Sequence, residues 1–188
     1  MGLNAQVNLP IPEDVHKAIV FCLNSGIKSN EITNEKIDKA LVHKNKPENV
    51  VISHPVILDE KNKIYRTKVL VDQSHNFFFD HQLRHLPGML LLEAARQFGT
   101  AISHLFFDAP YDSQFILHDL GSQFVAGAEV GTDVFIDVMI IDVKIKNGKL
   151  RKMSGVGYVH QNSEIIGKIT SSWSIIPAKV VRHLTRFH

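Results

Sequence analysis

The sequence has little cysteine and little net charge. Cys22 is the only cysteine among 188 residues, so no disulfide can form within the chain, and we expect Cys22 to be a small buried side chain. The formal net charge is only +2, which gives no basis for a nucleic-acid surface. A composition of 44% hydrophobic and 21% charged residues is typical of a globular protein with a sizeable core.

Several functional signatures are also missing. The chain contains no Gly-x-Ser-x-Gly motif, no dinucleotide-binding loop and no P-loop, which argues against a hydrolase elbow, a Rossmann domain and an NTPase. Residues 1–14 show no basic segment followed by an apolar run, so no secretory signal is predicted. The sequence therefore predicts a cytoplasmic protein with neither a nucleic-acid partner nor a membrane partner.

The longest apolar segment runs from Pro87 to Phe107 and predicts one central helix. Apolar residues recur in it at the spacing of a buried helix face; they are Leu91, Ala94, Ala95, Phe98, Ile102, Leu105 and Phe106. The polar residues that interrupt it make a membrane span implausible. Glu93 has two interpretations that the pattern leaves open. It is either a solvated carboxylate paired with Gln97 near the positive end of the helix, or a carboxylate that projects into a pocket.

The remaining segments predict short helices first and strands later. Two helices are expected over residues 12–25 and 33–41, and a hairpin over 49–58 and 64–71. After the central helix we expect two short strands over 114–120 and 122–128, and a meander over 132–146, 149–160 and 164–176. Asn147-Gly148 is the strongest hairpin signal in the chain.

A long helix beside an antiparallel sheet defines an α+β class. A sheet wrapped around a single central helix is the hotdog architecture. The expected organisation is an N-terminal helical extension over residues 1–40, a hotdog domain over 41–178 and a C-terminal tail over 179–188.

The segment that leads into the central helix carries a motif. Phe77–Gln97 reads FFFDHQLRHLPGMLLLEAARQ, and Leu41-Val42-His43-Lys44 stands ahead of the first predicted strand. On these residues the chain resembles the AfsA family of A-factor biosynthesis hotdog proteins. A more distant likeness is to the hydroxyacyl-ACP dehydratases, whose His-Phe-Pro-Gly run is replaced here by His81-Gln-Leu-Arg.

The resemblance implies an activity and an assembly. AfsA-like proteins transfer a β-ketoacyl group from acyl carrier protein to the hydroxyl of dihydroxyacetone phosphate, on the way to γ-butyrolactone signals or related secondary metabolites. Well-known members carry two hotdog units, whereas this chain has room for one. A homodimer that uses acyl carrier protein or an acyl-CoA, without a cofactor, is therefore expected.

Acyl transfer needs a base, donors for the oxyanion and a tunnel for the chain. His81 is the first candidate for the base and His85 the second. The backbone N–H groups of Gly88 and Met89, at the start of the helix, could hold the thioester oxygen. Glu93 would orient a histidine or act as the acid–base group itself.

Further candidates each have a structural alternative. Arg84 and Arg96 could bind a phosphate in bidentate form, or could simply be surface charge. Gln97 is a further candidate for substrate binding. The acyl tunnel would be lined by an aromatic triplet that could equally belong to the core; it consists of Phe77, Phe78 and Phe79.

Other chemistry and other functions stay open as alternatives. His81 and His85 have a metal-like spacing, but Pro87 disfavours helix at Leu86 and no third ligand is suggested, so no metal is expected. His75, like the histidines at 104 and 118, is expected to be structural. Dehydration of a 3-hydroxyacyl thioester and thioester hydrolysis are alternative reactions, and a non-catalytic acyl-binding hotdog protein is the alternative of another class.

Overall fold

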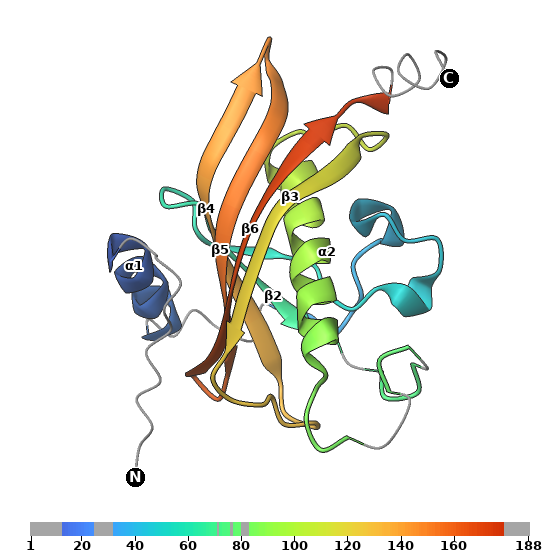
Figure 1. Ribbon diagram of the computed structural model, residues 1–188, viewed down its shortest axis with the longest axis vertical. Helices are drawn as coiled ribbons and strands as arrows, with labels where there is room; N and C mark the ends of the chain where they lie inside the picture. Colours follow the sequence, from blue (N-terminus) through green and yellow to red (C-terminus); the bar gives the residue numbers. More distant parts are fainter. Residues whose placement is uncertain (1–12, 25–31, 71, 76, 80–82, 179–188) are drawn as a thin grey trace.

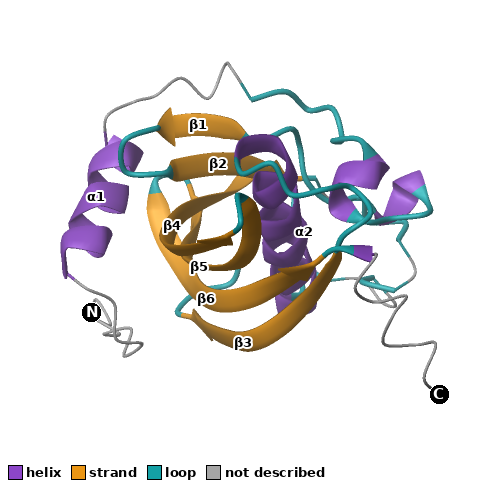
Figure 2. Cartoon of the chain, turned by 90° about the horizontal axis from the view of Figure 1, so that it is seen from above, coloured by secondary structure: helices purple, strands orange, loops and turns teal. Residues whose placement is uncertain are grey.

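A curved antiparallel sheet surrounds one long helix in the computed structural model, which describes residues 13–24, 32–70, 72–75, 77–79 and 83–178. The enclosed helix is α2 (Gly88–Phe106), and helix α1 (Glu13–Asn24) lies on the opposite face of the sheet (Figures 1 and 2). This arrangement is the hotdog fold, so the predicted α+β class and the N-terminal helix are confirmed. Neither helix in the described part of the chain has the length and apolarity that crossing a membrane requires.

The sheet has six strands in the order β1-β2-β4-β5-β6-β3. They are β1 (Val56–Asp59), β2 (Ile64–Val69), β3 (Gln114–Phe124), β4 (Val134–Lys146), β5 (Lys149–Gln161) and β6 (Glu164–Ile176). Asn147 and Gly148 have φ values of 53° and 66°, as a primed two-residue turn requires. The predicted meander is thus correct, and β3 is left at one edge of the sheet.

Helix α2 fills the concave side of the sheet. Leu91, Ala94, Phe98 and Ile102 are buried, as the periodicity predicts. Gly99 permits close approach of helix and sheet, because a Cβ atom at this position would lie 3.4 Å from two indole carbons of Trp173.

The helix predicted over residues 33–41 is wrong. Lys36 forms an isolated β-bridge with Ser53, and the Ile37 N–H donates to the Ile52 carbonyl at 3.1 Å. Because these backbone groups pair across the chain, only a short 3₁₀ helix, η2 (Lys39–Val42), follows.

Two strand predictions also need correction. The strand expected over 49–58 is divided into a 3₁₀ helix, η3 (Pro47–Asn49), isolated bridges, and β1, which starts only after Pro55. The two short strands expected around Gly121 are one strand, β3, because Gly121 sits in the ladder opposite Thr170. A glycine within a pattern of this kind does not have to end a strand.

The convex side of the sheet has its own apolar layer. Val15, Ile19 and Cys22 of α1 pack with side chains of β2 and β5, including Ile64 and Tyr158. Cys22 is 4% exposed, in agreement with its expected role as a small buried side chain.

Candidate functional site

A groove with a volume of about 630 Å³ follows α2 on the side of β3 and β6, a size typical of small-molecule sites. Apolar side chains supply most of its surface, among them Phe78, Leu92, Leu117 and Trp173. A smaller polar part comes from α2, the preceding loops and β6; it consists of Lys44, Asn49, His75, Glu93, Arg96, Thr100 and Ser171. The groove can therefore hold an apolar chain next to charged groups.

Glu93 lies at the centre of the polar part. Its carboxylate is 2.7 Å from Lys44 Nζ, 2.8 Å from Arg96 Nε and 2.8 Å from Gln97 Nε2. Burial alone would raise the pKa of Glu93, but the hydrogen bonds from Arg96 and Lys44 outweigh burial and lower the pKa to about 2. At neutral pH the carboxylate is ionised and holds two cations at the edge of the groove.

Gln97 joins the helix to the loop beside it. Its side-chain oxygen accepts from the Val51 N–H at 3.0 Å, and its amide nitrogen donates to the Asn49 carbonyl and to Glu93, both at 2.8 Å. Gln97 is fully buried. Because both ends of the amide are engaged, this side chain is suited to positioning Glu93 rather than to holding an oxyanion.

His75 enters the groove from the loop before the aromatic triplet. Its Nε2–H donates to Asn49 Oδ1 at 2.9 Å, and its Nδ1 accepts from the Phe77 N–H at 3.3 Å. These two bonds fix the neutral tautomer of the ring. His75 thus aligns Asn49 and Phe77 at the groove.

A pair of histidines, His43 and His104, lies next to the groove. His104 Nδ1–H donates to the Ala109 carbonyl at 2.8 Å, which leaves its Nε2 to accept from His43 Nε2–H at 2.9 Å. Burial lowers the pKa of both rings, and the pKa of His43 is lowered further by the neighbouring His104 and Arg96. The pair ties the residue before Lys44 to α2, and Phe115 of the groove packs edge-on against both rings.

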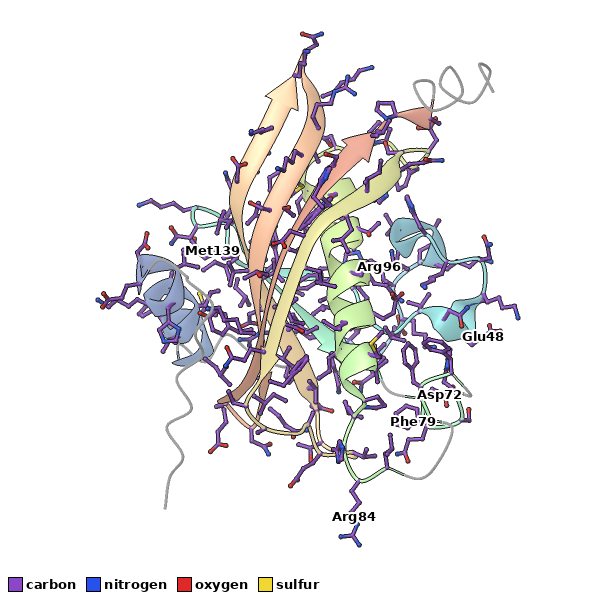
Figure 3. The ribbon with its side chains drawn as sticks, in the orientation of Figure 1. Glu48, Asp72, Phe79, Arg84, Arg96 and Met139 are labelled. Atoms are coloured by element: carbon purple, nitrogen blue, oxygen red, sulfur yellow. The ribbon has the colours of Figure 1, made fainter. Side chains whose placement is uncertain are left out.

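The predicted site residues are only partly brought together. His81 lies outside the described residues. His85 is exposed and pairs through its backbone with Glu129, and it does not line the groove. Arg84 is exposed, and its side chain points away from the body of the protein (Figure 3), whereas Arg96 lines the groove.

The remaining predicted residues also lie partly at the groove and partly outside it. Phe77, Phe78 and Met89 line the groove, whereas Phe79 lies outside its lining and packs against the core. Gly88 is the first residue of α2, and no side chain caps the helix at Pro87. The N–H groups of Gly88 and Met89 are therefore at the positive end of the helix dipole, and Met89 borders the groove.

Five residues of the polar part are missing from the predicted site: Lys44, Asn49, His75, Thr100 and Ser171. The sequence places Lys44 in a motif, Asn49 at the start of a strand and His75 among the structural histidines. The lysine and histidine stand in or beside the quoted motif segments, but no spacing rule relates Lys44 to Glu93, because the contact arises only from the tertiary fold.

The fold and the groove together define a hotdog protein with a ligand-sized site along its central helix. The family model for the A-factor biosynthesis hotdog domain matches residues 27–177, and the chain therefore belongs to the AfsA family. A curated relative, 2-oxo-3-(phosphooxy)propyl 3-oxoalkanoate synthase of Streptomyces virginiae, is 40% identical over 47 residues. That match spans 25% of this chain and 16% of the synthase.

Solved structures agree with the fold. Conserved protein PA5202 of Pseudomonas aeruginosa superimposes with a TM-score of 0.51 at 13% identity, over 74% of this chain and 100% of that protein. A hot-dog-like protein of Thermanaerovibrio acidaminovorans gives a TM-score of 0.51 at 14% identity, over 68% of this chain and 92% of its own. Similarity at this level of identity defines the architecture alone.

Proposed function

We propose that the protein transfers a β-ketoacyl group from a thioester, carried by acyl carrier protein or coenzyme A, to a hydroxyl of a small phosphorylated acceptor such as dihydroxyacetone phosphate. The observation that carries this proposal is the pairing, in one groove, of an apolar surface with two cations, Lys44 and Arg96, held by Glu93. Family membership and the printed name of the Streptomyces relative support the same chemistry.

In the proposed reaction the acceptor hydroxyl attacks the thioester carbonyl. The C–S bond breaks, a C–O ester bond forms, and the thiolate leaves with the proton that a base took from the hydroxyl. His81 is the proposed base, and the N–H groups of Gly88 and Met89 are the proposed oxyanion donors. Lys44 and Arg96 would bind the phosphate of the acceptor, because these two cations together with Glu93 keep a net positive charge at the groove.

The charge state of Glu93 favours transfer over dehydration. Dehydration of a 3-hydroxyacyl thioester needs a general acid for the departing hydroxyl, and an effective acid has a pKa near the working pH. Hydrogen bonds from Arg96 and Lys44 lower the pKa of Glu93 to about 2, so its carboxyl carries no proton to give.

Hydrolysis of the thioester is the second candidate reaction. The protein yhdA of Lactococcus lactis, a candidate thioesterase, has the same fold at 17% identity, with a TM-score of 0.51 over 71% of this chain and 98% of its own.

Product analysis tests the proposed function. The protein is incubated with a β-ketoacyl-ACP and, in parallel, with dihydroxyacetone phosphate, with dihydroxyacetone, or with no acceptor, and the products are identified by mass spectrometry. We expect a phosphorylated ester only where the phosphorylated acceptor is present. Free β-keto acid in equal amount in all three would instead indicate a thioesterase, and tight acyl binding without any product would indicate a binding protein.

Arg96→Ala is expected to weaken the preference for the phosphorylated acceptor. Loss of one charge-assisted contact, worth about 1.5–3 kcal/mol, should reduce the ratio of kcat/KM for dihydroxyacetone phosphate to that for dihydroxyacetone at least about tenfold. Arg84→Ala is the matched control, since Arg84 is exposed and outside the groove. An equal effect of the two substitutions on this ratio would contradict the phosphate role of Arg96.

A homodimer through β3 is proposed alongside the reaction. β3 is at the edge of the sheet, and its apolar side chains are exposed: Ile116 by 43%, Leu117 by 52% and Leu120 by 45%. An exposed edge with apolar residues is a site for pairing with another chain. Leu120→Lys should shift the sedimentation coefficient from that of a dimer to that of a monomer, and a wild-type protein that sediments as a monomer at micromolar concentration would contradict the proposal.

A further inference from the structure

One buried indole ring lines the groove on its sheet side. Trp173 of β6 is 7% exposed, whereas Phe77 and Leu117 at the rim are 74% and 52% exposed. Trp173 is also the only tryptophan in the chain. Its ring lies against Gly99 of α2, so it closes the groove along the line where helix and sheet meet.

The ring is held in place from behind. Trp173 Nε1–H donates to Ser103 Oγ at 3.1 Å, and Ser103 Oγ is itself 2.8 Å from the Gly99 carbonyl and 3.3 Å from Met153 Sδ. Ser103 and Met153 are fully buried. A ligand that pushed the indole aside would therefore have to break a buried hydrogen bond and enter packed core.

Gly99 lets the ring lie close to the helix. Glycine is unfavourable inside a helix, and a Cβ atom here would lie 3.4 Å from both Cζ2 and Cη2 of Trp173, which is van der Waals contact. The indole therefore packs directly against the backbone of α2 at this position.

We propose that Trp173 sets the length of the acyl chain that the groove accepts, by ending the path of the chain at the face of its ring. This inference rests on the proposed function of the groove as an acyl site. A growing chain gains affinity about fourfold with each buried methylene until its tip meets the indole. Beyond that length, added methylenes stay in water and the gain stops.

The position of the tryptophan supplies a direct probe. Wild-type protein is titrated with straight-chain fatty acids of increasing length, and binding is followed by tryptophan emission and by calorimetry. We expect emission to respond to every chain that reaches the floor, and affinity to rise with length up to a limit.

Two variants should move this limit to longer chains by different amounts. Trp173→Leu opens the floor, so affinity for the chain one methylene beyond the wild-type limit should rise about fourfold. Trp173→Phe keeps a smaller aromatic ring, so the limit should move by less. Ile145→Ala is the control at an exposed position of β4 outside the groove and should leave the limit where it is.

The results distinguish a failure of the role of Trp173 from a failure of the acyl site. An unchanged limit in cooperatively unfolding Trp173→Leu and Trp173→Phe would overturn the role of Trp173 while leaving the acyl site intact. Wild-type protein that binds no fatty acid and shows no change in emission would overturn the acyl site itself. Should Trp173→Leu fail to fold, Trp173→Phe decides, because it keeps an aromatic ring at this position.

Discussion

Replacing Glu93 with glutamine is expected to lower kcat/KM for acyl transfer at least about a hundredfold. The carboxylate holds Lys44 at 2.7 Å and Arg96 at 2.8 Å, and glutamine removes the negative charge from both contacts. Without the carboxylate, each cation loses a charge-assisted contact worth about 1.5–3 kcal/mol. The side chains of Lys44 and Arg96 then have no common partner to fix their positions at the groove. Steady-state kinetics with the phosphorylated acceptor measures the effect, and Glu129→Gln, in an exposed position outside the groove, is the control.

The pH profile distinguishes positioning from acid–base catalysis by Glu93. Its pKa is lowered to about 2 by the hydrogen bonds from Arg96 and Lys44, against the effect of burial. The group therefore does not titrate between pH 5 and 9, and the shape of the pH–rate profile should be the same in wild type and Glu93→Gln. A limb of the profile that vanishes in the variant would show that Glu93 itself exchanges a proton during turnover.

Replacing Asp137 with alanine is expected to cost about 3–5 kcal/mol of the free energy of unfolding. Asp137 is fully buried and receives Arg66 Nε at 2.6 Å and Arg66 Nη2 at 2.7 Å. Its removal leaves a guanidinium that is largely buried without a counterion. Urea denaturation followed by tryptophan emission measures the loss.

A second ion pair of the same strand region is the matched control. Asp133 lies 2.7 Å from Lys68, but its side chain is 62% exposed, and pairs of that kind are worth about 1 kcal/mol or less. Asp133→Ala should thus leave the urea midpoint nearly unchanged. Equal losses for Asp133→Ala and Asp137→Ala would mean that burial of the Arg66 pair does not govern its contribution.

The buried pair of Asp137 and Arg66 predicts a fold that is sensitive to acid. Burial would raise the pKa of Asp137, but the hydrogen bonds from Arg66, together with the nearby His160 ring, prevail and lower it below the ordinary value of 3.8. The folded state binds this proton less readily than the unfolded state, so the stabilisation is complete above pH 3.8 and is lost as pH falls through the lowered pKa.

The architecture followed from local patterns where those patterns are strong. The apolar spacing after Pro87 predicted α2, and Asn147-Gly148 predicted the turn between β4 and β5, because helix periodicity and primed turns are encoded by neighbouring residues. The helix predicted over residues 33–41 is wrong because its pattern is short. The hydrogen bond from the Ile37 N–H to the Ile52 carbonyl outweighs that local preference.

The site was less accessible from the sequence. The sequence offers Glu93 as a carboxylate in an apolar helix and Arg96 as a possible phosphate ligand. Lys44 comes from a segment 49 residues before Glu93 and reaches it only after the chain folds. The environment that lowers the pKa of Glu93 could not be read from the motif for the same reason. The role of Gln97 also changed, because its partners Asn49 and Val51 lie on a different segment.

The groove is proposed to deliver an acyl group to a phosphorylated alcohol rather than to water. The most direct test is the partition of the acyl group between ester and free acid as dihydroxyacetone phosphate is increased at a fixed concentration of β-ketoacyl-ACP. We predict that the ester fraction rises to saturation while free acid falls by the same amount. Release of free acid at a rate that does not depend on the acceptor, with no ester at any concentration, would contradict the claim.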